Sequence, residues 1–130
     1  MLKERAEYYY TQNYNCAETI LHAANDEYAL GLDEETMRLV AGFGGGMGCG
    51  QACGALCGGV CVLSRALVDD RAHLTPELRG KTTKLVAAFR RILGDTQCKN
   101  LMPKYKTPEN GCLETILLGC EALSEVMEEK

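Results

Sequence analysis

The segment from Gly48 to Cys61 contains four cysteines at strict four-residue spacing, set among glycines. On an α-helix, residues four apart follow one another along one ridge, each about 6 Å further along the axis and about 40° further round. Neighbouring thiols can share a site on such a ridge, but Cys49 and Cys61 would stand about 18 Å apart, too far to bind one ion or one small cluster. One site can therefore take one or two thiolates from this segment, and the others must come from elsewhere.

The glycines of this segment remove side-chain bulk, so that another backbone or a cofactor can approach the ridge. Each glycine inside a helix costs about 1 kcal/mol relative to alanine, and we expect a close contact that offsets this cost. The surrounding stretch 42–63 is long enough to cross a bilayer. It contains nine glycines but few large apolar side chains, so we interpret it as a buried central helix rather than a membrane span.

Composition narrows the class of protein. The chain has 130 residues, 46% of them hydrophobic, which is enough for one domain with its own core. A net charge of -4 argues against a general nucleic-acid binder. The first ten residues carry charges where a secretory signal has its apolar stretch, so we expect a cytoplasmic protein. Thiols stay mostly reduced there, and eight cysteines then indicate a metal, a cluster or redox chemistry more often than structural disulfides.

Capping residues predict helices along the whole chain. Asn15 and Asp33 are candidate N-caps, and Thr75-Pro76 and Thr107-Pro108 are typical of helix starts. The predicted helices cover about 2–11, 16–28, 34–42, 48–68, 75–93 and 107–127, with an irregular stretch at 95–106. No window alternates apolar and polar residues as a strand does. We therefore predict an all-α, compact, single-domain bundle over 1–130, with about five to six helices around the Gly/Cys-rich central helix.

Three further cysteines could complete a site with the central helix. Cys16 and Cys112 fall in the first turns of predicted helices, and Cys98 lies in the irregular stretch. Thiols in a first turn are expected to have a lowered pKa, because the free N–H groups and the positive end of the helix dipole favour thiolate. The segment 71–106 holds nine Lys or Arg against two acids. Such charge would support thiolates or a negative cluster, although a solvated basic helix face is its commoner meaning.

The run Cys53-Gly-Ala-Leu-Cys57-Gly58 matches the motif Cys-Gly-Ala-x-x-Gly. With one cysteine before this run and two after it, the chain resembles the C-GCAxxG-C-C family of putative redox-active proteins over most of its length. The resemblance implies a redox or iron–sulfur role for four characteristic cysteines. These are Cys16, Cys53, Cys98 and Cys112, called the cysteine quartet below. Cys49 or Cys57 could replace a member, whereas Cys61 and Cys120 are the best candidates for core filling.

Several functions are compatible with the quartet. We favour an iron–sulfur cluster held by four thiolates, for electron transfer or redox sensing, because no His or carboxylate pattern accompanies the cysteines. The alternatives are a structural zinc site, a metal-free pair that cycles between dithiol and disulfide, and a helical homodimer module in which the cysteines are buried core residues. No nucleophile–base–acid set is recognisable. The expected partner is another redox protein, or a second copy of the chain.

Overall fold

A computed structural model describes residues 1–129 of the chain. Within them lie seven α-helices, two short 3-10 turns and one short glycine-rich segment with a largely non-helical backbone, η2, and no strand. They are α1 (Leu2–Tyr10), α2 (Cys16–Glu27), α3 (Glu34–Met37), η1 (Arg38–Phe43), η2 (Gly46–Gly50), α4 (Gly54–Leu67), η3 (Ala72–Leu74), α5 (Glu77–Leu93), α6 (Cys98–Tyr105) and α7 (Leu113–Met127). The predicted all-α fold is confirmed.

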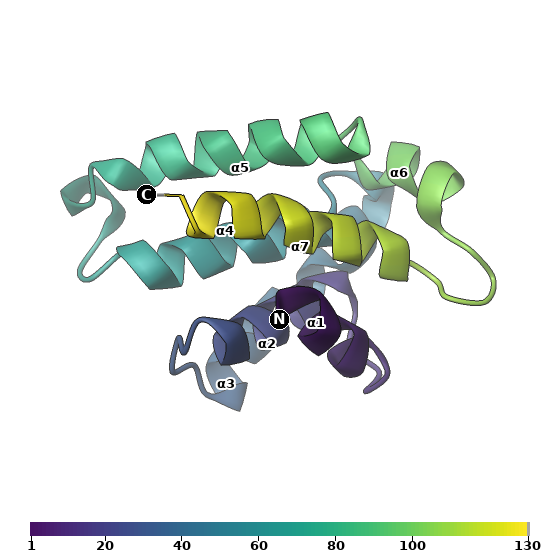
Figure 1. Ribbon diagram of the computed structural model, residues 1–130, viewed down its shortest axis with the longest axis horizontal. Helices are drawn as coiled ribbons and strands as arrows, with labels where there is room; N and C mark the ends of the chain where they lie inside the picture. The colour runs from purple at the N-terminus through teal and green to yellow at the C-terminus, as the bar shows by residue number, and fades with distance from the viewer. Residues whose placement is uncertain (130) are drawn as a thin grey trace.

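The arrangement of the helices is visible in Figure 1. Helices α4, α5 and α7 lie alongside one another, α1 and α2 pack beneath α7 and α4, and α6 covers one end of the molecule. Fully buried side chains fill the space between these layers; the largest include Phe89, Ile20, Leu63, Ile116 and Leu123. Burying such side chains is the main favourable contribution to folding.

Local capping fixes several helix ends where the sequence predicts them. The Asn15 side chain accepts a hydrogen bond from the Glu18 amide at 3.0 Å, and the Glu18 carboxylate accepts one from the Asn15 amide. This reciprocal capping box starts α2. Asp33 caps α3 by accepting from the Thr36 amide at 2.8 Å. Gly94, with φ of 94°, ends α5.

The glycine-rich segment differs from the predicted helix. Helix α4 begins at Gly54, not near residue 48, because Met47, Gly48 and Gly50 have positive φ angles of 61°, 72° and 74°. Glycine adopts this left-handed conformation without steric cost, and a helix cannot continue through it. Only two of the four cysteines in this segment lie within α4. The prediction of one continuous ridge from Cys49 to Cys61 was therefore wrong.

The connection before the last helix also differs from the prediction. The stretch predicted to be irregular contains α6, and Thr107-Pro108 does not open α7. Instead, the backbone of Thr107 pairs with that of Gly111 in both directions, at 3.1 and 2.8 Å, and Gly111 has φ of 57°. This tight turn delays the start of α7 to Leu113. In the described part of the chain, no helix is both long and apolar enough to span a membrane.

Glycine allows α2 and α4 to approach closely. A Cβ atom on Gly58 would lie 2.5 Å from Cγ2 of Ile20 and 2.9 Å from the carbonyl oxygen of Ala17. Real side chains do not tolerate such distances, and the second neighbour is backbone, which cannot move aside without moving α2. Close packing of two helices thus offsets the cost of a glycine inside α4.

We predict that Gly58→Ala destabilises the fold by about 1–3 kcal/mol, because the added methyl group forces α2 and α4 apart. Gly80→Ala is the matched control, since a Cβ atom there would meet nothing within 4 Å. That variant should gain up to about 1 kcal/mol from the higher helix propensity of alanine. Urea unfolding followed by circular dichroism measures both changes. Equal effects of the two substitutions would contradict the close α2–α4 contact.

Candidate cysteine site

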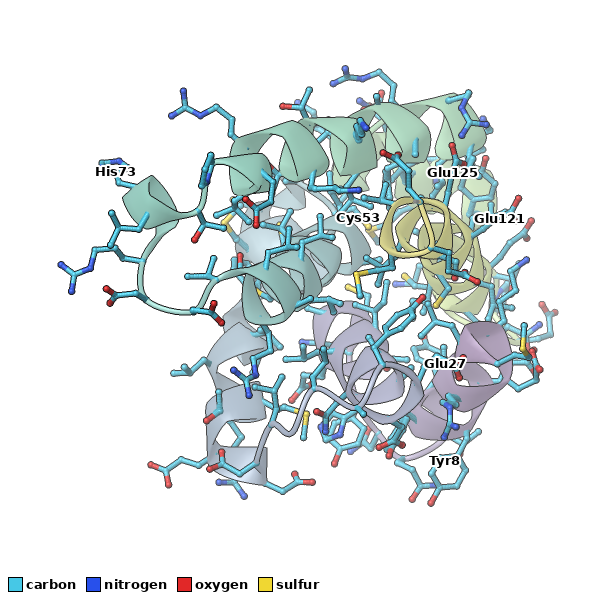
Figure 2. All side chains as sticks on the ribbon, turned by 60° about the vertical axis from the view of Figure 1, so that its left-hand side comes forward. Tyr8, Glu27, Cys53, His73, Glu121 and Glu125 are labelled. Atoms are coloured by element: carbon cyan, nitrogen blue, oxygen red, sulfur yellow. The ribbon has the colours of Figure 1, made fainter. Side chains whose placement is uncertain are left out.

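The fold brings the cysteine quartet to one cavity. All four members line a single cavity of about 210 Å³, although they are spread over most of the chain. Cys53 and Cys98 are buried, and Cys16 and Cys112 are partly buried. Figure 2 shows Cys53 in the interior, among the helices. The cavity is far larger than the space that one water molecule needs, so it can hold a group of several atoms.

Every member of the quartet stands at the N-terminal end of a helix. Cys16 and Cys98 are the first residues of α2 and α6, and Cys53 and Cys112 immediately precede α4 and α7. A helix N-terminus carries free N–H groups and a partial positive charge. Four such ends border one cavity, and this arrangement favours a negatively charged group inside it.

Two backbone hydrogen bonds hold Cys53 beside Cys98. The Cys53 amide donates to the Thr96 carbonyl at 2.8 Å, and the Cys98 amide donates to the Gln51 carbonyl at 2.7 Å. Together they form a short antiparallel bridge between the residues that precede the two cysteines. Asp95 caps the same segment by accepting from the amides of the next two residues. The start of α6 is thereby fixed to the start of α4.

Two glycines leave room for the thiols. A Cβ atom on Gly54 would lie 2.3 Å from Sγ of Cys16, and one on Gly46 would lie 2.8 Å from Cβ of Cys98. Any larger residue at either position would push a quartet member out of place. The expectation that glycines of the segment from Gly48 to Cys61 allow close approach is confirmed at Gly54, and Gly46, just before that segment, has the same effect.

Sequence reasoning did not identify the other residues that line the cavity. These are Tyr10, Tyr14, Asn15, Gly45, Leu101, Met102, Lys106 and Thr115. Lys106 is the one charged side chain among the described lining residues, and its charge partly offsets the rise in the pKa of the Cys98 thiol that burial causes. The basic segment 71–106 was a signal for Lys106, but no local pattern marks Tyr10, because it reaches the cavity from another helix.

Burial determines the charge state of the thiols. Desolvation raises the pKa of Cys53 to about 12, and the neighbouring Cys16 adds to this effect. Burial also raises the pKa of Cys16 and Cys98, and Cys112 raises both further. Backbone N–H groups of Ala17 and Gly45 lower the pKa of Cys16, as expected for a helix start, but burial outweighs them. The prediction of lowered pKa values at Cys16 was therefore wrong in its net direction.

The remaining four cysteines lie outside the cavity lining. Cys49 is exposed in η2, Cys57 and Cys61 are partly buried on α4, and Cys120 is fully buried on α7. All eight cysteines have free thiols. The cavity is therefore lined by the quartet and not by Cys49 or Cys57, the two substitutes that the sequence suggested.

The thiols of the cavity do not form the coordination shell of a single ion. Across residues 1–129, no three Cys, His, Asp or Glu side chains are placed to bind one metal ion. The buried His22 instead stacks on Tyr14, with 4.3 Å between ring centroids. Among Cys, His, Asp and Glu, only cysteines are found in the described lining of the cavity.

These features define an all-α protein in which four helix starts present cysteines to one cavity. The sequence model of the C_GCAxxG_C_C family, described as putative redox-active protein, matches residues 14–126, and the chain belongs to this family. No curated protein and no solved structure matches the chain significantly.

We predict that the metal-free protein loses stability at alkaline pH through its buried thiols. Burial raises the pKa of Cys120 to about 12, against 9.0 for a free thiol. The unfolded chain therefore releases this proton first, and the free energy of unfolding falls between pH 9 and 12, by about 1.4 kcal/mol per pH unit for one thiol. Below pH 9 the contribution is complete.

Urea unfolding at pH 8 and pH 10.5 measures this loss. Cys120→Ala should lose less stability over that interval than the unmodified chain, because its buried thiol is gone. Cys49→Ala, which removes an exposed thiol, serves as the control. If Cys120→Ala and the unmodified chain lose the same amount, Cys120 is not desolvated as described.

Proposed function

We propose that this protein is a redox protein whose cysteine quartet holds an iron–sulfur cluster. The observation that carries the proposal is the convergence of four cysteines, each at a helix N-terminus, on one cavity. Membership of a redox-active family supports the same class of function. A bound cluster would supply the ability to accept and release single electrons.

The residues around the cavity fit such a group. Four thiols are the ligand set that iron–sulfur clusters use, and soft sulfur donors disfavour hard cations such as Mg²⁺ and Ca²⁺. No His, Asp or Glu is among the described residues that line the cavity. A cluster of several iron and sulfide atoms needs more room than one ion does, and the volume of the cavity, about 210 Å³, is compatible with that need.

The surroundings of the quartet would stabilise the charge that ligation creates. The sulfide ions of a cluster neutralise most of the charge of its iron, and four thiolates outweigh what remains, so a site of this kind would be a net anion. Four helix N-termini and Lys106 supply positive potential around it. Burial of Cys53 and Cys98 limits access of water and oxidants. The raised pKa values mean that ligation must displace protons, so loading should become more favourable as pH rises.

Two other functions use the same residues. Zinc would need all four sulfur atoms about 2.3 Å from one ion, which requires the cavity to contract. A metal-free cycle would join two thiols as a disulfide and release two protons and two electrons to an oxidant. Its attacking group must be a thiolate, and the raised pKa of Cys16, Cys53 and Cys98 disfavours that form near neutral pH. The cluster is therefore the better-supported proposal.

We predict that Cys53→Ser abolishes cluster loading, whereas Cys120→Ser leaves it nearly intact. Both thiols are buried, but only Cys53 lines the cavity, so the pair separates ligation from packing. The measurements are visible absorbance and iron and sulfide content after reconstitution without oxygen. Circular dichroism confirms that both variants fold.

The colour, metal content and thiol count of the unmodified protein distinguish the three proposed functions. A brown protein with bound iron and sulfide supports the cluster. A colourless protein with one equivalent of zinc supports the structural zinc site, and a metal-free protein that loses two thiols on mild oxidation supports the disulfide cycle. Equal loss of metal in Cys53→Ser and Cys120→Ser would show that the cysteines contribute packing and not ligation.

A further inference from the structure

Tyr10, the last residue of α1, connects this helix to the cysteine site. Its hydroxyl oxygen accepts a hydrogen bond from the backbone amide of Cys112 at 3.0 Å. The contact depends on Gly111, because a Cβ atom there would lie 2.4 Å from the Tyr10 hydroxyl oxygen. Gly111 also has a positive φ of 57°, which glycine adopts without strain. Together with the turn between Thr107 and Gly111, Tyr10 thus helps to fix the backbone of Cys112.

The Tyr10 hydroxyl has a second hydrogen-bonding capacity. A phenol accepts and also donates, and the amide of Cys112 uses only the acceptor. Among the described residues, the Tyr10 O–H donates to no protein group, in contrast to those of Tyr9 and Tyr105, which donate to Asp26 and to the Leu93 carbonyl. Tyr10 lines the cavity together with the quartet. The O–H group of Tyr10 is therefore free to donate a hydrogen bond at the cavity where thiolate or sulfide would be bound.

We propose that Tyr10 is a positioning residue that sets the reduction potential of the cysteine site, by fixing Cys112 and by donating its O–H to sulfur in the cavity. This inference rests on the proposed cluster. An electron taken up from a reductant adds negative charge to the site, and a hydrogen bond to sulfur then becomes stronger. The reduced state is stabilised more than the oxidised state, and the potential rises. Tyr10 keeps its proton, and no bond at the phenol is made or broken.

Tyr10 lies outside residues 14–126, the part of the chain that the family model matches. The proposal therefore makes α1 part of the site in this protein, although the quartet lies entirely on later elements. Tyr14 also lines the cavity, but its ring is stacked on His22, and no hydrogen bond joins it to a described quartet residue.

The test compares Tyr10→Phe with Tyr105→Phe. Each removes one hydroxyl and keeps the ring, but Tyr105 does not line the cavity. Two quantities are measured. The first is the midpoint potential of the loaded protein, titrated with dithionite and followed by visible absorbance. The second is the hydrogen-exchange rate of the Cys112 amide in the metal-free protein, which needs no cluster.

We expect Tyr10→Phe to load a cluster, to have a more negative midpoint potential, and to exchange the Cys112 amide on the order of tenfold faster, as for the loss of one hydrogen bond. Tyr105→Phe should change neither quantity. Faster exchange with an unchanged potential would restrict Tyr10 to a structural role and overturn the inference. Unchanged exchange would overturn the contact itself. Failure of the unmodified protein to load iron and sulfide is a different result, because it overturns the proposed function and with it the tuning role.

Discussion

The close contact between α2 and α4 is the constraint on which the cysteine site depends. Gly58 brings the α4 backbone against Ala17, and Gly54 leaves space for the Cys16 thiol at the start of the same interface. Because both helices begin at this contact, their N-terminal ends face one cavity. The backbone bridge from Gln51–Cys53 to Thr96–Cys98 then adds the start of α6. Larger residues in place of Gly54 and Gly58 would push α2 away from α4.

Charge and burial act in opposite directions on the quartet. Helix N-termini and Lys106 favour thiolate, while desolvation favours the protonated thiol, and for Cys16, Cys53 and Cys98 desolvation has the larger effect. A buried group of neutral thiols is a poor nucleophile but a suitable precursor of a ligated site, in which metal replaces the protons. Positive potential therefore surrounds a cavity whose thiols are mainly protonated. This positive potential is too weak to deprotonate the buried thiols, but it would stabilise an anionic site after metal has replaced their protons.

Helix α1 completes this arrangement from outside the segment that carries the cysteines. It packs on α2 and α7, and its last residue reaches the cavity through the space above Gly111. The neighbouring Tyr9 donates to Asp26 on α2 and lies 5.0 Å from His22, centroid to centroid. Tyr9 and Tyr10 are neighbours in the sequence, but they have different roles. Tyr9 fixes α1 to α2, and Tyr10 reaches the start of α7.

The sequence alone determines those features that depend on residues close in the chain. The Asn15 and Asp33 caps, the end of α5 at Gly94 and the all-helical pattern follow from hydrogen bonds and dihedral preferences within a few residues. The family resemblance around Cys53 implied the four members of the quartet, but it did not indicate that they line one cavity. Local signals were misleading at the glycine run before α4 and at Thr107-Pro108, where left-handed glycines and a tight turn compete with helix.

Only the tertiary structure decides which cysteines share a cavity, which side chains accompany them and which charge state their thiols adopt. The spacing of Cys49 to Cys61 gave no means to select Cys53, because that choice depends on where α4 begins and what α2 leaves open. Tyr10 carries no mark in the sequence, and the basic segment 71–106 did not single out Lys106, since the distance of each residue to the site is set by packing. Desolvation, which reverses the expected pKa shift at Cys16, arises from neighbours that the chain brings together only when it folds.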